Sequence, residues 1–293
     1  MTDQELRQRA VLLYDRFTHE GLDRRIFMRE LTKLAGGAAA ANVLLAGIAA
    51  NPAAAAMIPE GDPRLQTRTV RWELIPGRKM SGYGAAPAKA RADLPVVIVI
   101  HENRGLTEHI RDVARRVALA GFSAVAPDFL SPAGGTPADE NRAREMIGNL
   151  DLAATVADGR AFIDWLSSPG GGSRKVGAVG FCWGGGMVNR LAIAAGANLR
   201  AGVVFYGPAP APAEATRVQA AMLIHLAEKD ERVNATAFPW ATALKDAGKN
   251  VTSVVHPGVN HAFHNDTSAE RYDKAAADRA WAATTAFFKA HLT

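Results

Sequence analysis

Residues 175–190 read Lys-Val-Gly-Ala-Val-Gly-Phe-Cys-Trp-Gly-Gly-Gly-Met-Val-Asn-Arg, and the fold can be worked out from this stretch. Its first part, Val176 to Phe181, is apolar enough for a strand that is buried on both faces. A helix is expected from Met187 to Ala195, entered through three consecutive glycines. Residues 180–184 therefore carry the pattern Gly-x-Cys-x-Gly at a sharp turn from strand to helix.

Cys182 stands at the tip of this turn and is the only cysteine of the chain. In an elbow of this kind the nucleophile adopts a strained backbone conformation, and glycines two residues to either side let the strand and the helix pass close together. The N-terminus of the helix also favours the thiolate, which is the reactive form of cysteine. Cys182 is therefore a candidate nucleophile, and the alternative is a small buried side chain in a glycine-rich turn.

Two later residues supply the partners that such a nucleophile needs. Asp230 comes shortly after one apolar run, and His261 follows the next apolar run and a Pro-Gly-Val-Asn turn. The chain order nucleophile, acid, histidine is that of α/β-hydrolases. Glu228 and Glu231 are rival positions for the acid, and all three carboxylates are also consistent with a solvated loop. The order of the partners favours the catalytic interpretation of Cys182.

Four motifs of the chain resemble those of the dienelactone hydrolase (carboxymethylenebutenolidase) family. They are His-Glu-Asn-Arg-Gly at 101–105, Gly-Phe-Cys-Trp-Gly-Gly-Gly at 180–186, Glu-Lys-Asp at 228–230 and Asn-His-Ala-Phe at 260–263. The resemblance covers roughly residues 67–291. It implies an α/β-hydrolase fold, a mainly parallel twisted sheet with helices on both faces, and hydrolysis of a small-molecule ester or lactone without a cofactor.

Attack on an ester carbonyl needs a nucleophile, a proton carrier and donors for the developing oxyanion. His261 beside Cys182 would give a thiolate and later protonate the leaving oxygen, while Asp230 would fix the imidazole tautomer. The resemblance selects Asp230 as the acid. It also implies that Glu102 contacts the thiol and helps convert it to the thiolate; the alternative for Glu102 is a loop carboxylate paired with Arg104.

The remaining site residues concern the oxyanion and the substrate. The backbone N–H of Trp183 and that of Asn103 are expected to form the oxyanion hole. Tyr206 matches a tyrosine near the pocket of the resembled family, and packing of its ring in the core is the alternative. Arg104 is expected either to bind a substrate carboxylate or to lie in solvent.

One departure from the family pattern concerns the substrate. In family members that act on dienelactone an arginine follows the catalytic histidine by four residues, where this chain has Asn265 and the next arginine is Arg271. The departure weakens the case for dienelactone itself more than the case for hydrolysis. His264 and Asp266 offer two metal-binding groups, but no third ligand stands at a recognisable spacing, so no metal site is predicted.

The composition limits the class of protein. With 293 residues, 48% hydrophobic and 22% charged, the chain can bury one large core, and a single catalytic domain is expected over residues 57–293. The net charge of +5 is spread along the chain without basic and aromatic residues interleaved, which argues against nucleic acid as a partner. A single cysteine excludes an internal disulfide and a cysteine-based metal cage.

Apolar runs alternate with helical patterns beyond residue 96, which predicts a mainly parallel sheet with functional loops at the carboxyl ends of its strands. Two earlier strands, at 67–75 and 80–86, are expected to pair as an antiparallel edge. Later strands are expected at 96–100, 122–126, 176–181, 201–206, 222–226 and 251–256, and helices at 107–120, within 138–167, at 187–195, 235–247 and 269–291.

Residues 1–56 have a different character from the rest. Residues 1–22 predict a short helix, and the stretch Asp-Arg-Arg-Ile-Phe-Met-Arg at 23–29 resembles a twin-arginine export motif. An uncharged stretch rich in alanine and glycine follows and ends in small residues near Ala56. These features predict engagement of the export machinery, cleavage near Ala56 and a periplasmic or secreted protein. The alternatives are an uncleaved membrane anchor and an alanine-rich helix packed on the domain, in an anchored or cytoplasmic protein.

The sequence thus predicts an exported hydrolase that cleaves an ester or lactone through a thioester on Cys182. Three alternatives stay open at this point: a carboxylesterase for unrelated esters, a non-catalytic binding protein that keeps the fold, and a protein that uses Cys182 as a thiol redox sensor. The sequence gives no basis for an oligomeric state.

Overall fold

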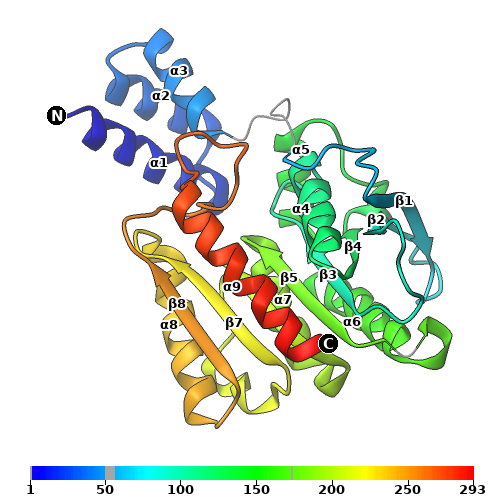
Figure 1. Ribbon diagram of the computed structural model, residues 1–293. Helices are drawn as coiled ribbons and strands as arrows, with labels where there is room; N and C mark the ends of the chain where they lie inside the picture. The colour runs from blue at the N-terminus through cyan, green and yellow to red at the C-terminus, as the bar shows by residue number, and fades with distance from the viewer. Residues whose placement is uncertain (1, 50–56, 173) are drawn as a thin grey trace.

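The computed structural model describes residues 2–49, 57–172 and 174–293. Within them, eight strands form one sheet in the order β1-β2-β4-β3-β5-β6-β7-β8 (Figure 1). The strands are β1 (Leu65–Trp72), β2 (Met80–Pro87), β3 (Val96–Ile100), β4 (Ser123–Asp128), β5 (Val176–Phe181), β6 (Leu199–Phe205), β7 (Ala221–Ala227) and β8 (Val251–His256). Strands β3 to β8 pair in parallel, and β2 pairs antiparallel with β1 and β4. The expected parallel sheet with an antiparallel edge is confirmed.

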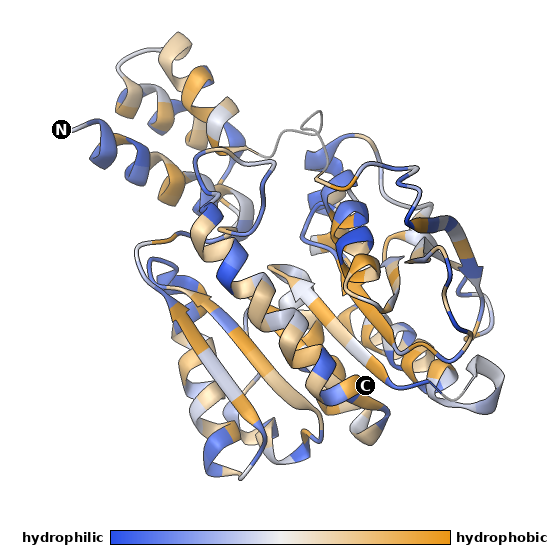
Figure 2. Cartoon of the chain, in the orientation of Figure 1, coloured by the Kyte–Doolittle hydropathy of each residue, from blue (hydrophilic) through white to orange (hydrophobic). Residues whose placement is uncertain are grey.

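Helices cover both faces of this sheet. They are α4 (Glu108–Leu119), α5 (Glu140–Gly148), α6 (Leu152–Ser167), α7 (Trp183–Ala194), α8 (Glu231–Asp246) and α9 (Lys274–Leu292). Successive residues of β3 alternate between two apolar clusters: Val97 and Val99 pack with α4 and α9, whereas Val96 and Ile98 pack with α6, α7 and α8. Burial on both faces explains why β3 is a continuous apolar run, drawn in orange in Figure 2.

Three helices begin four or five residues from their predicted starts, namely α7, α9 and α8, which begins at Glu231 instead of residue 235. Helix α7 begins at Trp183 instead of Met187, so the three glycines form its first turn. They are needed there because a Cβ on Gly184 would overlap the carbonyl oxygen of Ile100. Helix α9 begins at Lys274 instead of residue 269, because the preceding Asp273 caps it by accepting from the N–H of Ala276. Residues 262–272 therefore run as a loop.

The first helices form a small unit of their own, the N-terminal unit, which consists of α1 (Asp3–His19), α2 (Arg24–Ala35) and α3 (Ala38–Ile48). Its helices pack around a cluster that includes Val11, Phe17, Phe27 and Leu31, with the rings of Phe17 and Phe27 stacked 4.5 Å apart. All the apolar residues of this cluster come from within residues 10–49. Figure 1 shows the unit, in blue, beyond the carboxyl ends of the strands.

The predicted export segment falls largely within this unit. No single helix of the described residues is long and apolar enough to cross a membrane. Helices α2 and α3 reach that length only as a pair, and they are bent by 108° where Gly36 adopts a left-handed conformation. The cleavage position expected near Ala56 lies outside the described residues.

Candidate active site

Cys182 sits between the end of β5 and the start of α7. Its backbone has φ 54° and ψ −115°, a combination that costs a residue other than glycine about 1–3 kcal/mol. The conformation is held from both sides: the Cys182 N–H donates to the carbonyl oxygen of Phe205 at 3.0 Å, and a Cβ at Gly180 would overlap the carbonyl oxygen of Gly184. The strand and the helix thus approach so closely that the sulfur is presented at the sheet edge.

His261 and Asp230 meet at the same edge. Asp230 follows β7 and caps α8, and His261 lies in the loop after β8. The Nδ1–H of His261 donates to Oδ2 of Asp230 at 2.5 Å, and both side chains are buried. A ring nitrogen of His261 lies within 4.8 Å of Cys182 Sγ, and Nε2 has no hydrogen-bond partner among the described residues. Carboxylate and imidazole are therefore hydrogen-bonded to each other, and the sulfur lies close to the imidazole without a hydrogen bond to it.

Burial and neighbouring charges shift the pKa values of His261 and Asp230. Burial alone lowers the pKa of His261, but the Asp230 carboxylate and the Cys182 sulfur outweigh it and raise that pKa to about 10. Burial likewise raises the pKa of Asp230, yet the neighbouring His261 brings it below its ordinary value. An imidazolium at His261 is the partner that stabilises a thiolate at neutral pH.

Glu102 follows β3 and lines the same pocket as Cys182. Its Oε2 accepts from Nδ2 of Asn265 at 2.8 Å, whereas the buried Oε1 has no partner in the described part of the chain. A buried carboxylate oxygen without a donor is costly, which marks this position as one that another group approaches. Asn265, which stands where the resembled family has arginine, thus holds Glu102 in place.

Of the two residues predicted to supply oxyanion donors, Asn103 lines the pocket and Trp183 directly follows Cys182 in the chain. Trp183 is the first residue of α7, so its N–H has no acceptor one turn earlier in the helix. Asn103 lines the pocket, and its side-chain Nδ2 donates to the carbonyl oxygen of Thr18 at 3.2 Å.

Arg104 lies in the pocket and not in solvent. Its guanidinium pairs with Glu140 at 2.8 Å and contacts the hydroxyl of Tyr14. Arg271, from the loop that precedes α9, lines the same pocket, so the chain places two guanidinium groups near Cys182. The expected alternative pairing of Arg104 with Glu102 is not what the structure shows, since Glu102 bonds Asn265.

Tyr206 packs against the ring of His261. It follows β6 with a φ of 40°, and its fully buried ring lies 5.0 Å from that of His261, centroid to centroid. Burial raises the pKa of its hydroxyl well above the ordinary value, and that hydroxyl has no hydrogen-bond partner among residues the structure describes. The ring therefore packs on the imidazole and does not line the pocket around Cys182.

His264 and Asp266 do not line the pocket around Cys182. The ring of His264 packs against Phe181 at 5.1 Å between centroids, and Asp266 bonds His109 at 2.8 Å and also Arg116. Both residues hold the 262–272 loop against α4 and the sheet.

The sequence model of the dienelactone hydrolase family matches residues 80–292. The chain belongs to the dienelactone hydrolase family. A protein of Escherichia coli strain K12 named "Putative carboxymethylenebutenolidase" is 32% identical over 231 residues, which are 73% of this chain and 83% of that protein. The protein usf of Aquifex pyrophilus is 35% identical over 228 residues, 74% of this chain and 96% of its own.

A solved structure shows the same fold. The dienelactone hydrolase-like promiscuous phosphotriesterase P91 from metagenomic libraries matches with a TM-score of 0.67 at 25% identity. The match covers 78% of this chain and 100% of the phosphotriesterase chain. The chain is therefore an α/β-hydrolase-fold hydrolase, and residues 57–293 are called the hydrolase domain below.

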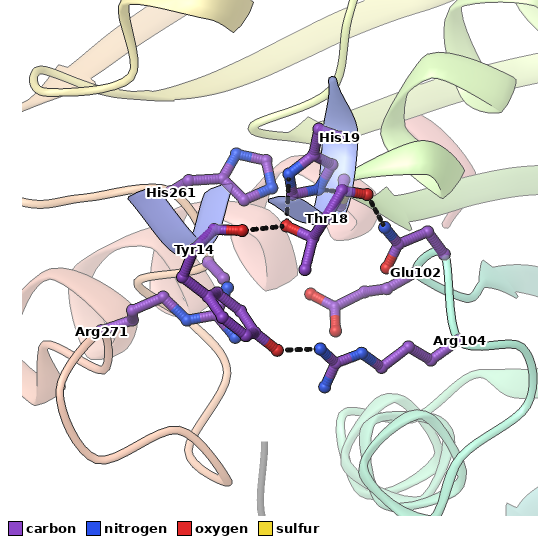
Figure 3. Close-up of a pocket in the computed structure, with 10 residues that line it drawn as sticks. Tyr14, Thr18, His19, Glu102, Arg104, His261 and Arg271 are labelled. Carbon is purple, nitrogen blue, oxygen red and sulfur yellow. Dashed lines mark hydrogen bonds between the residues drawn. The ribbon is translucent and has the colours of Figure 1, made fainter. Parts of the chain in front are cut away.

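One part of the hydrolase site was not predicted from the sequence: helix α1 closes it. Nε2 of His19 lies 3.2 Å from Cys182 Sγ, and Tyr14, Thr18 and His19 line the pocket (Figure 3). The cavity left beside the sulfur measures about 10 Å³, room for a single water molecule at most. The sequence predicts a short helix within residues 1–22, but nothing in its pattern indicates the surface that this helix covers.

Proposed function

We propose that this hydrolase cleaves a carboxylic ester or lactone by covalent catalysis on Cys182. The proposal rests on one observation above all: the Asp230–His261 pair, joined at 2.5 Å, turns an otherwise unpartnered imidazole face toward a sulfur held on a strained elbow. Membership of the dienelactone hydrolase family supports the reaction class.

The first half-reaction forms a thioester. The Cys182 thiolate attacks the carbonyl carbon, and the carbonyl oxygen takes the negative charge against the N–H groups of Trp183 and Asn103. One such donor typically stabilises the transition state by about 3 kcal/mol. As the C–O bond to the leaving group breaks, His261 donates its Nε2 proton to the departing oxygen. In a lactone the alcohol stays attached to the acyl group.

The second half-reaction releases the acid. Neutral His261 takes a proton from water, the hydroxide equivalent attacks the thioester carbon, and the C–S bond breaks to regenerate the thiolate beside an imidazolium. Asp230 keeps the Nδ1 proton in place throughout, so that Nε2 is the atom that exchanges protons. Glu102 is assigned to thiol activation, because it is the only acidic residue that lines the pocket beside Cys182 in the described residues and its Oε1 has no hydrogen-bond partner there.

Two arginines favour a substrate with an anionic group. Arg104 and Arg271 both line the cleft near Cys182, and guanidinium groups bind carboxylates through paired hydrogen bonds. A matched pair of substrates, a lactone bearing a carboxylate and its neutral methyl ester, tests this point. The preference for an anionic substrate is supported if the lactone that bears a carboxylate is turned over faster than its methyl ester and if Arg271→Gln removes this difference. Equal turnover of the two substrates by the unaltered chain contradicts it.

The function is tested by a screen across lactones and p-nitrophenyl esters of different acyl length, run beside two variants. Cys182→Ala should abolish turnover, and His261→Ala should allow an acyl adduct on Cys182 to accumulate for detection by mass spectrometry. Turnover that survives Cys182→Ala would rule out the mechanism. Reversible peroxide oxidation of the sulfur, without any ester cleavage, would instead favour a thiol sensor.

The route to the cell envelope is a second part of the proposal. Arg24 and Arg25 are exposed on the first turn of α2, where an export receptor can reach them while the hydrolase domain is folded. Sequencing the N-terminus of protein recovered from the native cell decides the matter. A start near residue 57 in the periplasm supports export and cleavage, and an intact Met1 in soluble cytoplasm contradicts them.

A further inference from the structure

Helix α1 occupies the part of the cleft where an anionic substrate would bind. Tyr14 lies between Arg104 and Arg271 (Figure 3), and the guanidinium carbons of these arginines lie 5.8 and 5.2 Å from the centre of its ring. The Tyr14 hydroxyl contacts Arg104, and Oδ1 of Asp15 lies 3.8 Å from Arg271. Both guanidinium groups are thus engaged by one turn of the chain's own N-terminus.

The next turn of α1 reaches the reacting atom. The carbonyl oxygen of Thr18 accepts from Asn103, and His19 Nε2 stands 3.2 Å from Cys182 Sγ. An acyl group bound to the sulfur would have to occupy the position of the His19 ring. With about 10 Å³ free beside the sulfur, a substrate and residues 14–19 cannot be in the cleft together.

The hydrogen bonds of His19 fix which nitrogen carries its proton. Nδ1 lies 3.0 Å from the carbonyl oxygen of Asp15, which can only accept, so Nδ1 is the protonated atom. Burial, with the charge of His261, lowers the pKa of His19 well below its ordinary value, so the ring is neutral and Nε2 is an acceptor. An acceptor facing Sγ favours the S–H form of Cys182 and disfavours the thiolate.

The contact between the N-terminal unit and the hydrolase domain is mostly polar. Arg7 pairs with Glu270 at 3.2 Å, Gln8 donates to Asn260 at 2.9 Å, and Ser268 donates to the carbonyl oxygen of Ile48 at 2.6 Å. The apolar clusters of the two parts share no residue among those described. Separation would therefore expose mainly polar surface, together with the rings of Tyr14 and Phe17, against which arginines of the hydrolase domain pack.

We propose that the catalytic cleft is a docking surface for residues 14–19 of the same chain, and that the N-terminal unit is an internal inhibitor that must leave the cleft before a substrate can bind. The unit fills the place of a substrate and sets a neutral hydrogen-bond acceptor, Nε2 of His19, against the sulfur. This goes beyond the proposed reaction, because the state of the Cys182 thiol can be measured whether or not an ester is cleaved.

The test uses the full chain with residues 50–56 replaced by a sequence-specific protease site. Alkylation of Cys182 by iodoacetamide and ester hydrolysis are measured before cleavage, after cleavage, and after the released unit has been separated. Separation should raise the alkylation rate by about tenfold or more, and adding the recovered unit back should lower it again. Unchanged or slower alkylation and hydrolysis after separation would show that the unit completes the site, and would overturn the proposal.

Variants of the uncut chain control for the case in which the separated hydrolase domain unfolds. The double variant Arg7→Ala/Gln8→Ala removes two interface contacts outside the cleft and should also speed alkylation, while Arg29→Ala, on the exposed side of α2, should leave it unchanged. Equal alkylation rates in these two variants would count against docking. Faster alkylation after separation without turnover of any ester would keep the docking proposal and refute the proposed hydrolysis.

Discussion

His19 Nε2 lies 3.2 Å from Cys182 Sγ although 163 positions separate the two residues in the chain. The ring of His19 also meets that of His261 edge to face, with centroids 4.8 Å apart. The sulfur thus faces two imidazoles in opposite states, a charged one paired with Asp230 and a neutral one held by the backbone of α1.

His19→Ala in the full chain should lower the pH at which the Cys182 thiol ionises, because the acceptor that stabilises S–H is lost while the His261 charge stays. The ultraviolet absorbance of the thiolate, followed against pH, measures the change. Arg16→Ala, on an exposed part of the same helix, is the matched control and should titrate like the unaltered chain. Superimposable curves for all three proteins would mean that His19 does not act on the sulfur.

The contact between His19 and Cys182 could not be predicted from the sequence. Strand β5 and the elbow at Cys182 follow from an apolar run and from glycines whose spacing has a steric cause, so they are predictable from local residues alone. The weak apolar stripe of α1, which includes Leu13 and Phe17, predicts only a short helix. The surface that buries it depends on how the whole chain is arranged in space, and no local pattern encodes that.

The starts of α7 and α9 illustrate a second limit of prediction from sequence. Glycine lowers helix propensity, so the run from Gly184 to Gly186 suggested a turn, yet the close approach of α7 to β3 requires glycine inside the helix. In the same way the cap at Asp273 decided where α9 starts, and the apolar periodicity beyond residue 269 did not reveal it. Tertiary packing and a single hydrogen bond overrode the propensity of the segment in each case.

Asp230→Asn should lower kcat by about three to four orders of magnitude with little change in KM, because the amide no longer holds the His261 tautomer or stabilises its charge. Glu231→Gln is the control: this neighbour was a rival for the same role in the sequence, and it is exposed on the first turn of α8. Steady-state kinetics on the best ester of the screen give both values. A larger loss in the Glu231 variant would reassign the acid.

Folding stability should fall as the pH rises from about 6.5 to about 10. His261 has a pKa raised from 6.5 to about 10 in the folded protein, so its charged form contributes stability that is fully present below 6.5 and is lost as the pH approaches 10. Urea unfolding at several pH values measures the slope, and the difference from His261→Gln isolates this residue from other titrating groups. Parallel curves for the two proteins would show that the His261 charge does not stabilise the fold.

Asn265→Ala should lower kcat/KM by about tenfold, since Glu102 loses the only hydrogen bond that orients its carboxylate in the described structure. The same change should cost about 1–3 kcal/mol of stability, because it leaves polar groups of a buried site without partners. Thermal melting and kinetics are measured together. Thr267→Val, which removes a hydroxyl that donates to the other end of Asn265, is the control and should affect stability more than kcat/KM.

Gly184→Ala should destabilise the hydrolase by about 1–3 kcal/mol or more, or prevent folding, because the added Cβ would overlap the backbone of Ile100 and cannot be relieved by a side-chain rotation. Gly148→Ala is the matched control: it lies in the last turn of α5, exposed, with no atom within 4 Å of the added Cβ. That change should stabilise by about 0.5–1 kcal/mol through the unfolded chain. Urea unfolding of both variants gives the comparison. Similar stabilities would mean that α7 can move away from β3, and the close packing that fixes the Cys182 elbow would then not be essential.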